Sequence, residues 1–156
     1  AGCGNGNYCP NDPVSRAQMA VFLERGMKGS SYVPPPATGT IFIDVAASDF
    51  AASFIEQLYL DGITAGCGNF NYCPDAEVTR AQMAVFLLRA RYGPDHSPPP
   101  AMGVFADVPL DYWAAVWIEQ LAAEGITVGC GNGNYCPEDP VTRDQMAVFL
   151  VRTFGL

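Results

Sequence analysis

The chain repeats itself, and this repetition constrains its fold more than any other feature. A cysteine-bearing segment occurs three times, over residues 3–25, 67–89 and 130–152. The second copy reads CGNFNYCPDAEVTRAQMAVFLLR, and the third reads CGNGNYCPEDPVTRDQMAVFLVR. Tandem units of this kind bury their apolar faces against neighbouring copies. We therefore expect a fold built from equivalent units that pack on one another.

The second and third copies are preceded by a further shared half that the first copy lacks. Residues 42–45 (FIDV) match residues 105–108 (FADV), and residues 55–58 (IEQL) match residues 118–121 (IEQL). The chain thus holds two and a half repeats. The predicted divisions are the C-terminal half of repeat 1 at 1–29, a linker at 30–40, repeat 2 at 41–92, a linker at 93–103, and repeat 3 at 104–156.

Each full repeat is predicted to be helix, loop, helix, which gives an all-α fold. Apolar residues recur at helical spacing over 49–61 and 111–124, and Gly62 and Gly125 follow as helix stops. The second helix of each repeat begins with a capping-box pattern, Ser or Thr followed three residues later by Gln. These pairs are Ser15 and Gln18, Thr79 and Gln82, and Thr142 and Gln145. Residues 41–43 and 103–105 are predicted to be short extended segments.

The two linkers each contain three consecutive prolines, at 34–36 and 98–100. Proline lacks an amide hydrogen and favours an extended polyproline conformation, so these stretches are predicted to be semi-rigid surface linkers. A docking site for a proline-reading domain and O-linked glycosylation of the neighbouring Ser and Thr residues are the alternatives.

The six cysteines form three pairs, each with five residues between the partners. Gly- and Asn-rich loops of this length can bring two α-carbons within bridging distance, and paired cysteines favour an oxidising compartment. We therefore predict disulfides between Cys3 and Cys9, Cys67 and Cys73, and Cys130 and Cys136. A metal site and reactive thiols are the competing interpretations. Zinc sites and redox motifs usually have closer cysteine spacing.

The composition disfavours several functional classes. The net charge is −8, and Lys28 is the only lysine beside seven arginines, so a nucleic-acid partner is not expected. No apolar run is long enough for membrane insertion, and any export signal would lie upstream of residue 1. No enzymatic constellation emerges around the single histidine, His96, and no cofactor is predicted. Glu56 and Glu119 are interpreted as solvated positions on helix faces.

Two further groups of side chains leave alternatives open. The Asn-, Asp- and Glu-rich cysteine loops contain oxygen ligands suited to calcium, although their spacing matches no EF-hand loop and ordinary turn chemistry explains them. Trp113 and Trp117 lie four residues apart, where helix spacing favours core packing, with sugar stacking as the alternative. Trp113 is the better candidate for the rim of a groove.

The motif order F-x-D-V, I-x-x-L-x-x-x-G-I, and [ST]-R-x-Q-M-A resembles that of the S-layer homology (SLH) domain, and the resemblance covers the whole chain apart from the linkers. It implies a pseudo-threefold bundle with grooves between adjacent repeats that bind cell-wall carbohydrate. By this resemblance Arg16, Arg80 and Arg143 face the grooves and bind an anionic group of the glycan. Ion pairs of these arginines with Asp44 or Asp107 are the alternative, and those two aspartates and Trp113 complete the candidate glycan-binding set.

Three departures from the family pattern matter. Glutamine replaces the usual glutamate of the T-R-A-E block in all three copies, the loops are framed by cysteines, and the first helix of repeat 1 is missing. The resemblance implies an extracellular or cell-envelope module that anchors a surface protein to wall polysaccharide or peptidoglycan, or forms part of a surface layer. The alternative is a subunit of a self-assembling filament. The missing helix suggests it, because a neighbouring chain could cover the apolar face that the first half-unit leaves unpartnered.

Overall fold

The computed structural model describes residues 2–156, which form five helices: α1 (Arg16–Lys28), α2 (Ala52–Leu60), α3 (Arg80–Tyr92), α4 (Ala115–Ala123) and α5 (Arg143–Phe154). This part of the chain has no β-strand, only isolated backbone bridges. The all-α prediction is confirmed, and the two predicted extended segments do not form strands. None of the helices in residues 2–156 is long and apolar enough to cross a bilayer.

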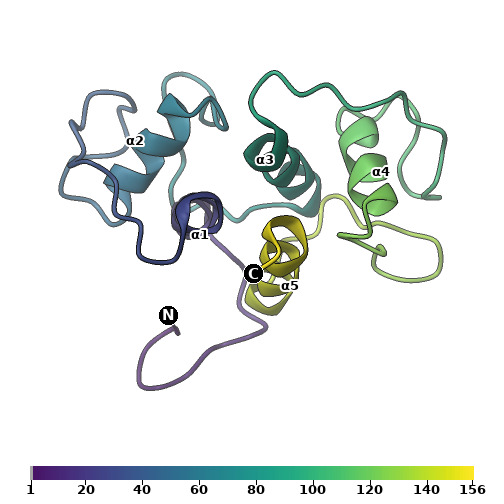
Figure 1. The fold of residues 1–156 in the computed structure, drawn as a ribbon, viewed down its shortest axis with the longest axis horizontal. Helices are drawn as coiled ribbons and strands as arrows, with labels where there is room; N and C mark the ends of the chain where they lie inside the picture. The colour runs from purple at the N-terminus through teal and green to yellow at the C-terminus, as the bar shows by residue number, and fades with distance from the viewer. Residues whose placement is uncertain (1) are drawn as a thin grey trace.

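Three helices form the centre and two lie outside them (Figure 1). α1, α3 and α5, the second helices of the three repeats, pack against one another. α2 packs on α1, and α4 packs on α3. The first helix of each full repeat therefore covers the second helix of the preceding repeat, so the repeat in sequence is not the packing unit in space.

A closed ring of backbone hydrogen bonds joins the three copies at the centre. Val14 N–H donates to the Val141 carbonyl at 2.8 Å, Val78 N–H to Val14 at 3.0 Å, and Val141 N–H to Val78 at 2.8 Å. All three valine side chains are fully buried. Because each copy makes the same bond to the next and the third returns to the first, the bundle has the pseudo-threefold arrangement that the sequence resemblance implies.

The capping boxes form at two of the three predicted positions. Ser15 and Thr79 accept from the backbone N–H groups of Gln18 and Gln82, and each glutamine side chain bonds back to the cap residue. Thr142 makes no side-chain cap, because its hydroxyl donates to the carboxylate of Asp144 instead. The third copy therefore starts its helix differently.

The first helices of the two full repeats, α2 and α4, are shorter than the predicted ranges 49–61 and 111–124, because the turns before them extend further. α2 begins after Ala51, which is in the left-handed conformation at φ 63°, and neither α2 nor α4 has a side-chain cap. Both end as expected, since Gly62 and Gly125 follow at φ 74° and 70°. The shortening places Phe50 and Trp113 in turns outside the helices.

The three predicted disulfides are confirmed: Cys3–Cys9, Cys67–Cys73 and Cys130–Cys136. In each pair the α-carbons are 6.0 Å apart. A short backbone turn brings them together, in which Asn7 N–H donates to Gly4 and equivalent bonds form in the other two loops. Each bridge closes a local loop and fixes the approach to a central helix.

The interpretation of Glu56 and Glu119 as solvated was wrong, because both are buried and hold the linkers. The Glu56 carboxylate accepts from the backbone N–H groups of Thr38 and Gly39 at 2.7 Å each. Glu119 accepts from Met102, Gly103 and Val104. Burial opposes ionisation of both groups, but these backbone donors outweigh it and hold the pKa of each carboxyl below its ordinary value. The linkers are thus fastened to α2 and α4.

The predicted position of the unpartnered apolar face was also wrong. α1, the helix of the incomplete first repeat, is covered by α2. No outer helix among residues 2–156 packs on α5. The missing half therefore leaves its gap at the other end of the chain, because first helices pack on the preceding repeat.

Candidate ligand grooves

The three predicted arginines occupy the first position of the central helices, and all three are buried. Each guanidinium donates through Nε to the carbonyl of a loop tyrosine in the next copy, whose hydroxyl donates back to the arginine carbonyl. The three Nε–carbonyl distances are 2.7 Å for Arg16 to Tyr72, 2.8 Å for Arg80 to Tyr135, and 2.9 Å for Arg143 to Tyr8. The hydroxyl bonds are 2.8, 2.8 and 3.0 Å long in the same order. The arginines therefore lie at the interfaces between copies.

Arg16 and Arg80 keep their charge without a carboxylate partner. No acid among residues 2–156 lies within ion-pair distance of either group. The guanidinium carbons lie 4.7 Å from the centroids of the Tyr72 and Tyr135 rings. Nη2 of each arginine is buried with no acceptor. For Arg16, burial lowers the pKa of the guanidinium, and electrostatic interactions with Tyr72 and Asp44 oppose this effect. Such a group offers charge-assisted donors to an anion.

Asp44 and Asp107 bind backbone instead of these arginines. The two Asp44 oxygens accept from the N–H groups of Tyr72 and Cys73, each at 2.7 Å. Asp107 binds Tyr135 and Cys136 in the same way, also at 2.7 Å. These aspartates therefore hold the cysteine loops whose tyrosine carbonyls accept from Arg16 and Arg80. The alternative prediction, an ion pair between these arginines and Asp44 or Asp107, is not observed.

Sequence reasoning missed a second set of arginines on the same helices. Arg25, Arg89 and Arg152 lie near the C-terminal ends of α1, α3 and α5. Arg25 lies 5.2 Å from the Phe54 ring, and Arg89 lies 5.6 Å from the Trp117 ring. Six of the seven arginines therefore recur as three pairs, one pair in each copy. That recurrence at the spacing of the repeats was the signal that could have identified them.

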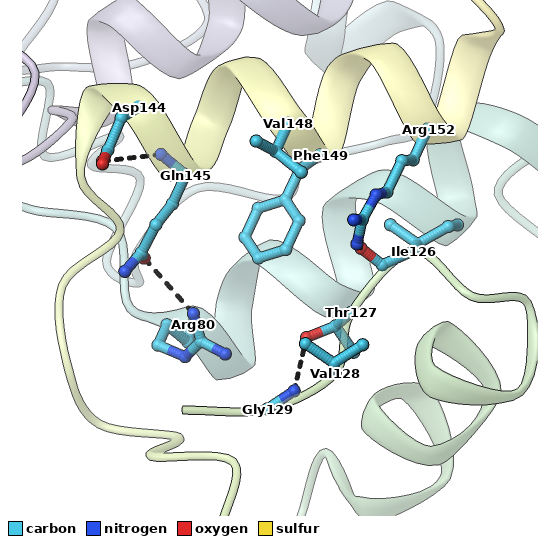
Figure 2. A pocket seen from close by; sticks show the side chains of 10 residues that line it. All are labelled: Arg80, Ile126, Thr127, Val128, Gly129, Asp144, Gln145, Val148, Phe149 and Arg152. Atoms are coloured by element: carbon cyan, nitrogen blue, oxygen red, sulfur yellow. Dashed lines mark hydrogen bonds between the residues drawn. The ribbon is translucent and has the colours of Figure 1, made fainter. Parts of the chain in front are cut away.

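Each of two surface hollows connects the first arginine of one copy with the second arginine of the next copy. Along α1 a hollow of about 450 Å³ runs between Arg143 and Arg25, past Gln18, with Phe50 and Phe54 on its far side. Along α5 a smaller hollow of about 270 Å³ is lined by the residues shown in Figure 2. Each groove thus combines an arginine from one copy with a glutamine and an arginine from the next.

The close-up of the α5 groove shows how its polar groups lie (Figure 2). Arg80 Nη1 donates to the Gln145 Oε1 at 3.2 Å, and Arg152 Nη1 donates to the Ile126 carbonyl at 3.1 Å. A glutamate at position 145 would neutralise Arg80, whereas the glutamine leaves its charge in place. Phe149 lies between the two arginines and forms an apolar floor.

Of the two tryptophans for which helix spacing favoured core packing, only Trp117 packs against the core. Trp113 lies before α4 with 59% of its surface exposed, so the core interpretation was wrong for this residue. Trp117 is half-buried against the core and faces Arg89. Phe50 is also exposed, and it lines the α1 groove. The aromatic residue of the preceding turn is therefore exposed in both full repeats, and only Phe50 is found at the rim of a described groove.

The cysteine loops offer little to a metal ion. One cluster of potential ligands occurs among the described residues, formed by Asp107, Cys130 and Cys136. Both sulfurs belong to one disulfide, and both carboxylate oxygens already accept backbone N–H groups. Zinc binding requires thiolates, so this cluster does not suit it.

The fold and grooves define a tandem-repeat helical module with arginines at the interfaces between its units. The chain belongs to the S-layer homology domain family, whose profile matches residues 42–84 and 104–147. It is 26% identical over 149 residues to S-layer protein EA1 of Bacillus anthracis, covering 96% of this chain and 17% of that protein. It is 28% identical to the surface-layer 125 kDa protein of Lysinibacillus sphaericus, covering 97% of this chain and 13% of that protein.

An enzyme is also among the relatives. The chain is 31% identical over 119 residues to an endoglucanase of Bacillus sp. (strain KSM-635), covering 72% of this chain and 12% of that protein. The chain spans less than a fifth of the length of these three relatives. The family and the surface proteins that share it indicate a location at the cell surface or envelope.

Proposed function

We propose that this chain is a non-catalytic module that anchors a surface protein non-covalently to cell-wall glycan through its arginine-lined grooves. The observation that carries the proposal is the buried, unneutralised guanidinium group of Arg80, which lines the α5 groove and has an Nη2 without an acceptor. In a protein with a net charge of −8, four of the seven arginines line the two grooves: Arg25, Arg80, Arg143 and Arg152. This distribution favours an acidic ligand.

The geometry suggests how a glycan chain would bind. Arg80 and Arg143, the N-terminal arginines of the grooves, are fixed by their Nε bonds and by the tyrosine rings, which orients their guanidinium groups for a carboxylate or phosphate. The exposed rings of Trp113 and Phe50 offer flat apolar faces to sugar rings. The second arginine of each groove, Arg25 or Arg152, would bind a neighbouring acidic substituent.

The anchoring role can be tested with purified cell-wall sacculi in a sedimentation assay. We expect Arg80→Gln and Arg143→Gln to reduce the bound fraction at least about tenfold, as loss of a charge-assisted bidentate contact does. Arg91→Gln is the matched control, because Arg91 lies outside the grooves and pairs with Glu124. Thermal melting identifies any variant that has lost its fold. Full binding by folded Arg80→Gln and Arg143→Gln proteins would contradict the proposal.

A second arm distinguishes the two glycan sources. Hydrofluoric acid cleaves phosphodiester-linked polymers from sacculi and leaves peptidoglycan. Binding that disappears after this treatment assigns the ligand to a secondary wall polymer, whereas retained binding that still depends on Arg80 assigns it to peptidoglycan.

Assembly into a surface layer or filament is a second candidate, and the exposed face of α5 favours it. Val148 and Val151 on this helix are about half exposed. Chains that cover this face for one another would associate with rising concentration. Electron microscopy and sedimentation of the purified chain test this candidate, and a monomer at high concentration would contradict it.

A further inference from the structure

The tip of the second cysteine loop carries a side chain that its backbone conformation disfavours. Phe70 lies in the left-handed region at φ 60°. The equivalent residues of the first and third loops are glycines, Gly6 at φ 76° and Gly133 at φ 77°. A bulky residue is an outlier in this region because its Cβ crowds the backbone, whereas glycine adopts it readily. The second copy thus has a phenylalanine where the other two copies have the residue that the backbone favours.

The fold does not compensate for this strain. The Phe70 side chain is 81% exposed, so burial contributes little. Its carbonyl accepts from the Ile43 N–H group at 3.0 Å, but the Gly133 carbonyl accepts from Ala106 in the same way and at the same distance. The backbone contact therefore requires no side chain at this position. Strained residues cluster at ligand-binding sites, where the side chain serves a contact outside the fold.

A second exposed apolar side chain accompanies the phenylalanine. Ile43, whose N–H group binds the Phe70 carbonyl, is 78% exposed. In the third repeat the same two positions are occupied by Ala106 and Gly133. The backbone hydrogen bond is the same in both repeats, and only the second repeat adds two large apolar side chains to it. The pair Phe70 and Ile43 is therefore a feature of the second repeat alone.

The backbone beneath this apolar pair is held firmly. The Cys67–Cys73 disulfide closes the loop, and the Cys67 N–H group donates to the Asn71 carbonyl at 2.8 Å. The Asp44 carboxylate accepts from the N–H groups of Tyr72 and Cys73 at 2.7 Å each. A loop that is ordered before binding loses little conformational entropy when a ligand contacts its tip.

The size and chemistry of the pair match a single sugar ring. An aromatic side chain buries about 150–250 Å², whereas each partner of a stable protein interface buries about 800 Å². The sequence neighbours of the ring are Asn69 and Asn71, uncharged amides that donate and accept hydrogen bonds. A neutral sugar has an apolar C–H face that stacks on an aromatic ring, and hydroxyl groups at its edge that bind amides.

We propose that Phe70 and Ile43 form a stacking site for one neutral sugar of a wall glycan, outside the arginine-lined grooves. This assignment rests on the proposed function, because it takes wall glycan as the ligand of the chain. The Tyr72 carbonyl, which accepts from Arg16 at 2.7 Å, lies two residues along the same loop. The α-carbons of Phe70 and Tyr72 are therefore within about 7 Å of each other. Neighbouring sugars of one glycan can reach both the loop tip and this interface between copies.

The first test measures sedimentation with purified, protein-free sacculi. Phe70→Gly introduces the residue of the other two loops, and we expect it to weaken binding about three- to tenfold, as loss of an aromatic stacking contact does. Its melting temperature should not fall, because the strain is removed with the ring. Ile43→Ala should weaken binding by a smaller factor. Phe70→Tyr keeps the ring and should bind fully, as should Val33→Ala at an exposed linker position.

The second test uses N-acetylated chitotetraose, a soluble neutral oligosaccharide, with the whole chain. We expect it to shift the amide resonances of Asn69 and Phe70. The same shifts should occur in the Arg80→Gln chain, because stacking on an aromatic ring requires no charged partner. This probe needs no substitution in the loop, so it remains informative if a loop variant does not fold.

Two patterns of loss distinguish the stacking site from the grooves. Full sacculus binding by folded Phe70→Gly and Ile43→Ala chains, with no chitotetraose shift at Phe70, would overturn the stacking site. The groove proposal would stand in that case if Arg80→Gln still reduced binding, and both would fail if it did not. Dimers of the chain that Phe70→Gly abolishes would assign the pair to a second copy and also overturn the stacking site.

Discussion

The helices α3 and α5 have nearly the same sequence, QMAVFLLR against QMAVFLVR after the first turn, but different surroundings. α3 is covered by α4, and Leu87 and Leu88 are fully buried. On α5 the residue equivalent to Leu88, Val151, is 49% exposed. An apolar pattern therefore specifies a helix and the faces that can be buried, whereas burial itself depends on which other segment is present. Because each first helix packs on the preceding copy in a closed ring, the absence of a first helix from repeat 1 leaves α5 of the last copy uncovered.

The largest expected difference between the two helices concerns their leucines. Leu87→Ala removes a fully buried side chain and should lower the free energy of unfolding by about 2–5 kcal/mol. Leu150→Ala at the half-buried equivalent position should cost about 1 kcal/mol or less. Urea unfolding of both variants measures the difference. Equal losses would show that α5 is covered in solution.

The next smaller difference in stability is expected between the loop tyrosines Tyr135 and Tyr8. Tyr135→Phe removes a buried hydrogen bond to the Arg80 carbonyl and should cost about 1–2 kcal/mol. Tyr8→Phe removes the same bond from a half-exposed ring, where water replaces the hydroxyl, so about 0.5 kcal/mol is expected. The same urea titrations apply, and a cost for Tyr8→Phe as large as that for Tyr135→Phe would contradict the exposed position of this loop.

Acid titration tests the linkers of the two covered positions. The pKa of Glu56 and of Glu119 is held below the ordinary value of 4.5 in the folded chain. Their stabilising contribution is therefore fully present above pH 4.5 and is lost as the pH falls through the folded pKa. Glu56→Gln and Glu119→Gln should flatten the decline of the melting temperature below that pH. Glu77→Gln, at an exposed loop position, is the control and should leave the slope unchanged.

The smallest expected effect is at the helix caps. Thr79→Ala removes a capping box and should cost about 1 kcal/mol. Thr142→Ala removes a hydroxyl that caps no backbone group, so its cost should be less than half as large. Thermal melting of the two variants measures this difference, and a larger loss for Thr142→Ala would show that α5 is capped in solution.

Much of the fold could be predicted from local sequence. The helix starts, the glycine stops and the disulfides depend on residues only a few positions apart, and these predictions were correct at Ser15, Gly62 and Cys67. The burial of Glu56 could not be predicted, because its partners Thr38 and Gly39 lie in the preceding linker. The covering of α1 by α2 likewise depends on how repeats close on one another, which a linear pattern does not encode.

The candidate site was predicted in part for similar reasons. The repeated Thr-Arg and Ser-Arg positions drew attention to Arg16, Arg80 and Arg143. The alternative of an ion pair with Asp44 did not take into account that this carboxylate accepts from two loop N–H groups. Arg89 was missed because a lone arginine near a helix end is common. Only its recurrence in all three copies distinguishes it.

Native-state hydrogen exchange of the whole chain tests the central claim most directly, because it measures α3 and α5 in the same molecule. We predict that the backbone amides of Leu150–Thr153 exchange at least about tenfold faster than those of Leu87–Ala90, since the outer face of α5 lacks a covering helix. Equal protection of the two helices in a monomeric sample would contradict the open position on α5.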